Sequence, residues 1–305
     1  MQHTNKRTLI CKIAPIGAIV ARQSCLLHLA YREFLLDWKR FFDSIGLNGT
    51  RWQWKIMLWQ RKLKQGGHST HGYGGSAMAT NILLILNLAF FTAMVLRGIF
   101  YGGVFNALLH PGSELLVISG GQWWPWVLEH HQWWRCISYA FTHAGLIHIG
   151  FNMMVLYQIG PQLEREIGSA GFISVYVLCT VCATLLGLFW HPDIVVVGAS
   201  GALFGLIGFS ISYFHRVGGQ YALAQRDFML KWALFAFVFG FMVGADNAAH
   251  LGGALCGLAC GALFPITVRG RQNWRVPINV VAIICTVATG ASLAMVVASW
   301  VANHV

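Results

Sequence analysis

Seven long apolar segments follow one another between residues 79 and 301, and they constrain the fold more than any other feature of the chain. A helix rises about 1.5 Å per residue, so about 20 apolar residues cross the hydrocarbon core of a bilayer. The segments cover residues 79–96, 137–158, 171–190, 194–214, 228–244, 248–266 and 277–301. The fold class that they predict is all-α, a polytopic membrane helix bundle.

The composition excludes the main alternatives to a membrane protein. Of the 305 residues 56% are hydrophobic and only 10% are charged, whereas about 25% of a soluble domain is charged. These values exclude a soluble enzyme, an acidic disordered chain and a disulfide-rich secreted domain. Four of the eight cysteines, Cys179, Cys182, Cys256 and Cys260, lie inside apolar segments. We expect them to be free thiols that pack as small apolar residues.

The charge is concentrated at the start of the chain. Residues 1–77 hold twelve of the 21 Lys and Arg residues and only three acids. Apolar residues at helical spacing in 27–42 and 51–64 predict either amphipathic segments on an anionic membrane surface or a small cytoplasmic helical subdomain. Basic residues interrupt every apolar run near the start, so we expect no cleavable signal peptide. We thus expect a basic extension (1–77), a six-helix core (78–267), and a loop with a seventh helix (268–305).

The basic residues also predict an orientation. Nineteen of the 21 fall in the extension or in alternate loops, and only Arg97 and Arg135 fall on the other side. Loops rich in Lys and Arg stay in the cytoplasm. We therefore expect a cytoplasmic N-terminus, an outer C-terminus and, as the location, a bacterial inner membrane. The tryptophan-rich loop 98–134 then lies outside, either partly sunk in the interface or as an ordinary extracellular loop.

Polar residues inside the apolar segments are the functional candidates, because ionisable groups are costly in a membrane. They form three groups: Thr142, His143, His148 and Asn152; Gly198-Ala199-Ser200-Gly201; and Asp246-Asn247-Ala248-Ala249-His250. The predicted orientation puts Ser200 and His250 near the outer ends of their segments, at similar depth. Rows of glycine, Gly201/Gly205 and Gly253/Gly257/Gly261, predict that these two helices approach closely.

This placement predicts nucleophilic catalysis by serine. A serine hydroxyl attacks a carbonyl when a neutral histidine takes its proton, which gives Ser200 and His250 as nucleophile and base. The oxyanion needs fixed donors, and the amide of Asn152, the ring of His148 and the Ser200 backbone N–H are candidates. Asp246 lies one turn before His250. We interpret it as a surface acid and the pair Ser200–His250 as a dyad.

The order and spacing of these residues resemble the rhomboid intramembrane serine proteases. The resemblance spans about residues 79–266 and includes Trp134-Arg135, His143, His148, Asn152, Gly160, Glu164, Gly198-Ala199-Ser200-Gly201, Ala249-His250, Gly253 and Gly257. It implies that Ser200 is the nucleophile, that His250 is the base, and that His148 and Asn152 help to form the oxyanion hole. It also implies cleavage of single-pass membrane proteins in or near their transmembrane helix, without metal or cofactor. The added seventh helix looks like the six-plus-one form of the family.

The sequence lacks the residues that a metalloprotease or an aspartyl protease would require. No His-Glu-x-x-His motif is present, and zinc bound by His143, His148 and His250 would have no cysteine or carboxylate at the usual spacing. The acids Asp193, Asp227 and Asp246 lie only at segment edges, which disfavours an aspartyl protease.

We expect lipid and single-pass membrane proteins as partners, and no nucleic acid. A non-catalytic binder of transmembrane helices stays open, although such a relative would be expected to lack the serine or the histidine. A transporter is a weaker alternative because no repeated halves are found.

Overall fold

The computed structural model describes Asp43, residues 77–242 and residues 246–302. The chain divides into two units, Met1–Gly72 and Tyr73–Val305, and the second unit contains every described residue except Asp43. The expected basic extension and its amphipathic segments lie outside the described residues, apart from Asp43 and Ala77. The predictions made for them stay predictions.

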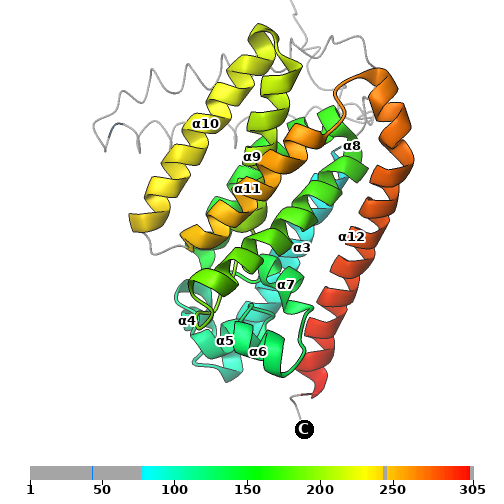
Figure 1. Ribbon diagram of the computed structural model, residues 1–305. Helices are drawn as coiled ribbons and strands as arrows, with labels where there is room; N and C mark the ends of the chain where they lie inside the picture. The colour runs from blue at the N-terminus through cyan, green and yellow to red at the C-terminus, as the bar shows by residue number, and fades with distance from the viewer. Residues whose placement is uncertain (1–42, 44–76, 243–245, 303–305) are drawn as a thin grey trace, which may run out of the picture. The chain divides into compact units, whose positions relative to one another are not determined.

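The second unit is built of helices, with no strand in the described ranges. The long helices are α3 (Met78–Arg97), α8 (Leu146–Trp190), α9 (Ser200–Val217), α10 (Gly219–Met242), α11 (Asn247–Leu263) and α12 (Val268–Ala302). The short ones are η1 (Gly98–Phe100), α4 (Val104–Leu109), α5 (Ser113–Ile118), α6 (Trp124–Glu129), α7 (Arg135–Ser138) and η2 (Tyr139–Phe141). Figure 1 shows the short helices gathered at one end of the long-helix bundle, the end at which α12 finishes. The all-α prediction is confirmed.

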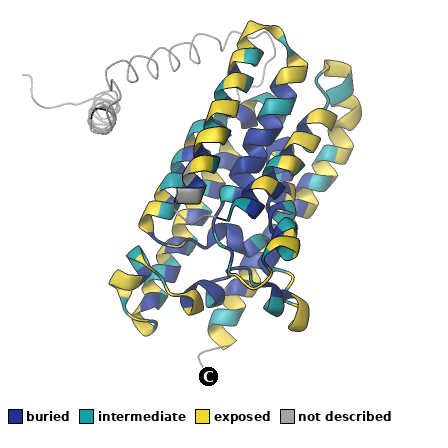
Figure 2. Ribbon diagram, turned by 60° about the vertical axis from the view of Figure 1, so that its left-hand side comes forward, coloured by how far each residue is buried: buried dark blue, intermediate teal, exposed yellow. Residues whose placement is uncertain are grey.

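The outer faces of the helices are apolar. Three helical stretches, Met78–Phe100, Leu146–Trp190 and Val268–Ala302, are long and apolar enough to cross a membrane, and Asn247–Leu263 is a shorter apolar helix. Figure 2 shows buried residues between the helices and exposed ones around them. Many of the exposed residues are large and apolar, such as Ile85, Leu234 and Ile283. Apolar surface on this scale suits contact with lipid, so the bundle is a polytopic membrane protein.

Helix α8 is broken in the middle by Gly168. Its 45 residues would extend for about 68 Å as one straight helix, roughly twice the thickness of the hydrocarbon core. Gly168 has φ 80° and ψ 156°, a conformation that glycine adopts without the strain a side chain would cause. The break separates two arms, 146–167 and 169–190, which correspond to the second and third predicted spans.

Four predicted span starts are wrong. The second span was expected from residue 137, but α8 begins at Leu146, because residues 135–141 form the short helices α7 and η2. The fourth was expected from residue 194, but α9 begins at Ser200, because Val196 makes an antiparallel bridge with Gln122. The fifth was expected from residue 228 and the seventh from residue 277, but α10 begins at Gly219 and α12 at Val268, because the first turns of both helices carry polar and charged residues that an apolar count omits.

Glycine rows bring α9 and α11 into backbone contact, as the sequence predicted. A Cβ atom added to Gly253 would lie 1.9 Å from the carbonyl oxygen of Gly201, and one on Gly257 would lie 1.9 Å from that of Gly205. Both distances are far inside van der Waals contact, so only glycine fits. Helix α8 packs against both α9 and α11. Figure 1 shows α10 and α12 on either side of this group.

Candidate active site

Ser200 and His250 lie side by side at the beginnings of their helices. Ser200 is the first residue of α9, and His250 lies in the first turn of α11. Nε2 of His250 is 2.9 Å from Oγ of Ser200, within hydrogen-bonding distance. His250 is buried and Ser200 is half-buried. The close packing of α9 on α11 is what lets two side chains from different helices meet at this distance.

Asn247 fixes the orientation of the His250 ring. Its Oδ1 atom is 3.1 Å from Nδ1 of His250, and an amide oxygen only accepts hydrogen bonds. The proton therefore sits on Nδ1, and Nε2 can accept the Ser200 hydroxyl proton. The ring of Phe204, one turn after Ser200, stacks on the imidazole at a centroid distance of 4.2 Å. The sequence pattern included Asn247 among the polar candidates but gave it no role, although its place three residues before His250 puts both on one helix face.

Asp246 is more than the surface acid that the sequence suggested, and that interpretation was wrong. Its Oδ1 atom accepts the backbone N–H of Ala249 at 2.9 Å, which caps the start of α11. The same atom is 2.8 Å from Nε2 of His191, which follows the last residue of α8. No bond joins its carboxylate to the His250 ring in the described part of the chain. Asp246 thus ties the start of α11 to the end of α8.

His148 and Asn152 face the backbone that leads into Ser200. A Cβ atom on Gly198 would lie 2.6 Å from Nε2 of His148 and 3.3 Å from Nδ2 of Asn152. The backbone N–H of Ala144 donates to Nδ1 of His148 at 3.3 Å, which leaves the ring proton on Nε2. Nδ2 of Asn152 is buried and has no hydrogen-bond partner among the described residues. Two N–H donors therefore lie beside Gly198.

His143 lies outside this group and also outside the helix in which the sequence placed it. It belongs to the loop between η2 and α8, where it is fully buried. Burial, and to a lesser degree the nearby His148, holds the pKa of His143 well below its usual range, so the ring is neutral. Its ring meets that of His148 edge to face at 5.2 Å. His143 therefore supports His148 by packing.

Comparison with known proteins matches part of the chain to one protein family. A family model described as the rhomboid domain matches residues 130–267, a range that contains Ser200, His250, His148 and Asn152. Residues 130–267 therefore form a rhomboid domain. The chain spans about half the length of most of the curated relatives that it matches.

Three relatives illustrate the range of the proteins that this chain resembles. RHOMBOID-like protein 2 of Arabidopsis thaliana is 33% identical over 173 residues, which are 55% of this chain and 53% of the relative. Rhomboid protease AarA of Providencia stuartii is 27% identical, over 60% of this chain and 71% of the relative. Inactive RHOMBOID-like protein 8 of Arabidopsis thaliana is also 27% identical, over 48% and 43% of the two chains. The relatives thus include a chain named as a protease and one named as inactive.

Two further residues of the sequence motif support the rhomboid fold around the site. Arg135 is buried, and its Nη1 atom donates to the carbonyl oxygens of Val117 at 2.5 Å and Gly121 at 2.7 Å. Burial lowers the pKa of Arg135 to about 10, so the guanidinium stays charged at neutral pH. Glu164 lies near the break in α8 and accepts the backbone N–H groups of Ala79 and Thr80 at 2.9 and 2.8 Å. It thereby fixes the start of α3.

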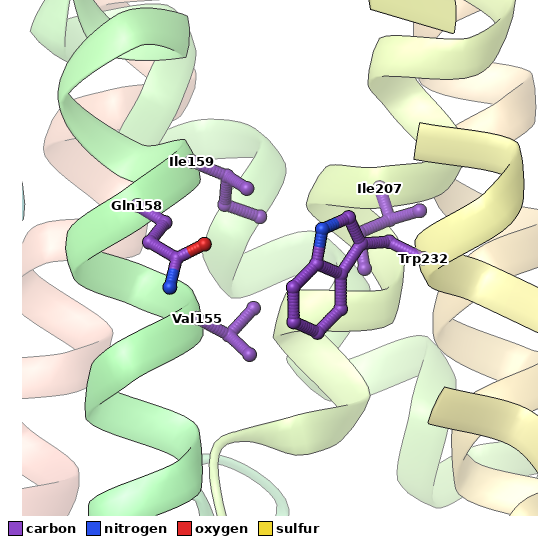
Figure 3. A pocket seen from close by; sticks show the side chains of 5 residues that line it. All are labelled: Val155, Gln158, Ile159, Ile207 and Trp232. Carbon is purple, nitrogen blue, oxygen red and sulfur yellow. The ribbon is translucent and has the colours of Figure 1, made fainter. Parts of the chain in front are cut away.

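A small pocket lies between α8, α9 and α10. Its lining residues are Val155, Gln158 and Ile159 of α8, Ile207 of α9 and Trp232 of α10. Figure 3 shows the Trp232 ring reaching from α10 toward the α8 side chains. Helix α10 packs mainly on α9.

Proposed function

We propose that this rhomboid-family chain is an intramembrane serine endopeptidase with a Ser200–His250 dyad. The observation that carries the proposal is the 2.9 Å contact between Oγ of Ser200 and Nε2 of His250. It is supported by Asn247, which holds the proton on the other ring nitrogen. A neutral imidazole in this tautomer is the form that a general base requires.

The proposed reaction follows from these atoms. Oγ of Ser200 attacks the carbonyl carbon of the scissile peptide bond while Nε2 of His250 takes the hydroxyl proton. His250 then gives that proton to the leaving amine, and an ester joins the substrate to Ser200. A water molecule, deprotonated by the same nitrogen, hydrolyses the ester and restores the serine. The chemistry calls for no metal or cofactor.

His148 and Asn152 are the proposed donors to the oxyanion, together with the Ser200 backbone N–H. The support is their place beside Gly198 and the buried Nδ2 atom of Asn152, for which the described residues supply no acceptor. Such a donor is expected to gain its partner when charge develops on the substrate oxygen. Removing one donor of this kind typically costs about 2.7–4 kcal/mol in the transition state.

The proposed substrates are single-pass membrane proteins held in the lipid bilayer. Ser200 and His250 both begin their helices, so the dyad is displaced toward one end of the bundle, and the distribution of Lys and Arg favours that end as the outer one. We propose an N-terminus in the cytoplasm and, as the location, a bacterial inner membrane. A helix shields its own peptide bonds, so the cut should fall near the outer end of the substrate helix, beside small residues and a Gly or Pro that weakens it.

The second candidate function is a non-catalytic binder of transmembrane helices. The observation that keeps it open is the relative named Inactive RHOMBOID-like protein 8. It has less support, because this chain keeps both the serine and the histidine in contact.

Reconstitution with a model single-span substrate separates the two functions. The wild type should cleave, whereas Ser200→Ala and His250→Ala should not. Ser210→Ala is a matched control, because Ser210 is buried in the same helix and its hydroxyl donates to the backbone carbonyl oxygen of Leu206, one turn earlier, at 2.8 Å. Equal cleavage by Ser200→Ala and His250→Ala would contradict the dyad. A wild type that binds the substrate without cleaving it would favour the binder.

A further inference from the structure

The last turn of α12 makes a specific polar contact with Ile118, the last residue of α5. The indole Nε1 of Trp300 donates to the carbonyl oxygen of Ile118 at 2.8 Å. The half-buried ring also lies 6.1 Å from the ring of Phe90, and the guanidinium of Arg97 sits over it at 5.3 Å. Phe90 and Arg97 belong to α3, so Trp300 joins α12 to two other elements at once.

Apolar packing one turn earlier reinforces this contact. Val296 of α12 is fully buried, and its Cγ2 atom would lie 2.8 Å from a Cβ atom placed on Gly120. Gly120 has φ 101°, a conformation that favours glycine. Helix α12 therefore packs directly against the backbone of residues 117–122, which we call the carbonyl segment.

The carbonyl oxygens of this segment are bound by side chains from elsewhere in the chain. Five consecutive carbonyl oxygens accept side-chain hydrogen bonds: Val117 from Arg135, Ile118 from Trp300, Ser119 from Thr142, Gly120 from Ser138 and Gly121 from Arg135. Four of these bonds come from residues 135–142, just before α8. The fifth comes from α12. The seventh helix is therefore an integral part of the framework that holds this segment.

The carbonyl segment in turn holds the backbone that leads to Ser200. Gln122, its last residue, exchanges two backbone hydrogen bonds with Val196, at 2.9 and 2.8 Å. Two residues later the N–H of Gly198 donates to the carbonyl oxygen of Tyr139 at 2.9 Å. Gly198 is the residue against which His148 and Asn152 pack. A continuous path of hydrogen bonds and backbone therefore connects Trp300 to residues 196–198, which precede Ser200.

We propose that α12 is a positioning element for this site and that Trp300 is its positioning residue. By holding Ile118 it fixes the carbonyl segment, and through Gln122 it fixes residues 196–198 beside the nucleophile. The claim about catalysis rests on the proposed protease function, whereas the claim about the backbone does not. The alternative is that α12 only anchors the chain in lipid, toward which Ile283, Ile284 and Val287 are exposed.

Hydrogen exchange read by mass spectrometry tests the claim about the backbone on the full chain in lipid nanodiscs. Trp300→Phe keeps an aromatic ring and removes only the donor. The matched control is Trp274→Phe, since Trp274 is an exposed tryptophan of the same helix. We expect faster exchange in residues 117–122 and 196–198 for Trp300→Phe alone, by about two- to tenfold if one net hydrogen bond is lost. No change, or a rise spread evenly over all helices, overturns the proposal.

Cleavage kinetics supply the second readout. If the chain is a protease, Trp300→Phe should lower kcat by a similar factor and leave KM unchanged, because Trp300 contacts Ile118, Phe90 and Arg97 and acts on Ser200 only through the backbone. A wild type that cleaves nothing would contradict the protease function, yet the exchange result would still decide whether Trp300 holds the carbonyl segment. Faster exchange with an unchanged kcat would show that the contact does not position the nucleophile, which overturns the catalytic part of the inference.

Discussion

Oδ1 of Asn247 lies 3.1 Å from Nδ1 of His250, one turn away on the same helix, so the ring nitrogen that faces Ser200 is the unprotonated one. Asn247→Ala should lower kcat about tenfold, because the ring loses one net hydrogen bond and with it the preference for this tautomer. Asn247→Asp keeps an acceptor in place and should recover most of the activity. The measurement is steady-state cleavage of a reconstituted substrate, with Asn106→Ala, an exposed asparagine of α4, as control. An unchanged kcat in Asn247→Ala would show that the amide plays no part.

The cap on α11 leads to a prediction about stability. Asp246→Ala removes the acceptor of the Ala249 N–H and should lower the free energy of unfolding by about 1 kcal/mol, the usual loss for an N-cap. Asp246→Asn can still cap the helix. Its free energy of unfolding should therefore fall less than that of Asp246→Ala, and most of the fall should come from the weakened contact with His191. Thermal unfolding in detergent compares the two. If Asp246→Asn proved as unstable as Asp246→Ala, the cap would not be the main role of this side chain.

The close contact between α9 and α11 predicts that one added methyl group lowers both stability and activity. Gly253→Ala places a Cβ atom 1.9 Å from the carbonyl oxygen of Gly201, so the helices must separate. Overpacking of this kind costs about 1–3 kcal/mol or more, and it should also part Ser200 from His250. The control is Gly290→Ala in α12, where a Cβ atom meets nothing within 4 Å. Normal unfolding temperature and activity in Gly253→Ala would contradict the close packing.

The Nδ2 atom of Asn152, which has no hydrogen-bond partner among the described residues, predicts a loss of catalysis without a loss of stability. Asn152→Ala should lower kcat by about a hundredfold and change stability little, because Nδ2 gives up no hydrogen bond within the described structure. Cleavage kinetics and thermal unfolding on the same sample separate the two effects. Met154→Ala, a half-buried change on the same helix, controls for packing. A fall in stability without a fall in kcat would make Asn152 a structural residue.

Much of this architecture could be predicted from the sequence, because apolar length and glycine spacing are properties of single helices and their contact faces. The helices occupy the seven expected positions, and the rows at Gly201/Gly205 and Gly253/Gly257 do bring α9 and α11 together. Ser200 and His250 meet for that reason. The polar pattern, together with the predicted depth of the two residues, singled them out as candidates.

The rest depended on interactions that spacing does not reveal. The starts of α8 and α9 were misplaced because short helices and a bridge between Gln122 and Val196 take up apolar residues before each helix. Asp246 read as a surface acid because its partner, His191, lies 55 residues away in the chain. The contact between Trp300 and Ile118 spans 182 residues. Such pairings follow only from the assembled bundle.

The Ser200–His250 dyad is tested most directly by covalent labelling of the intact chain with a fluorophosphonate, which bonds to an activated serine hydroxyl and releases fluoride. Peptide mass spectrometry then locates the added group. We predict one modified residue, Ser200, with no label in Ser200→Ala and much slower labelling in His250→Ala. Label on another serine, or equal rates in the wild type and His250→Ala, would contradict the dyad.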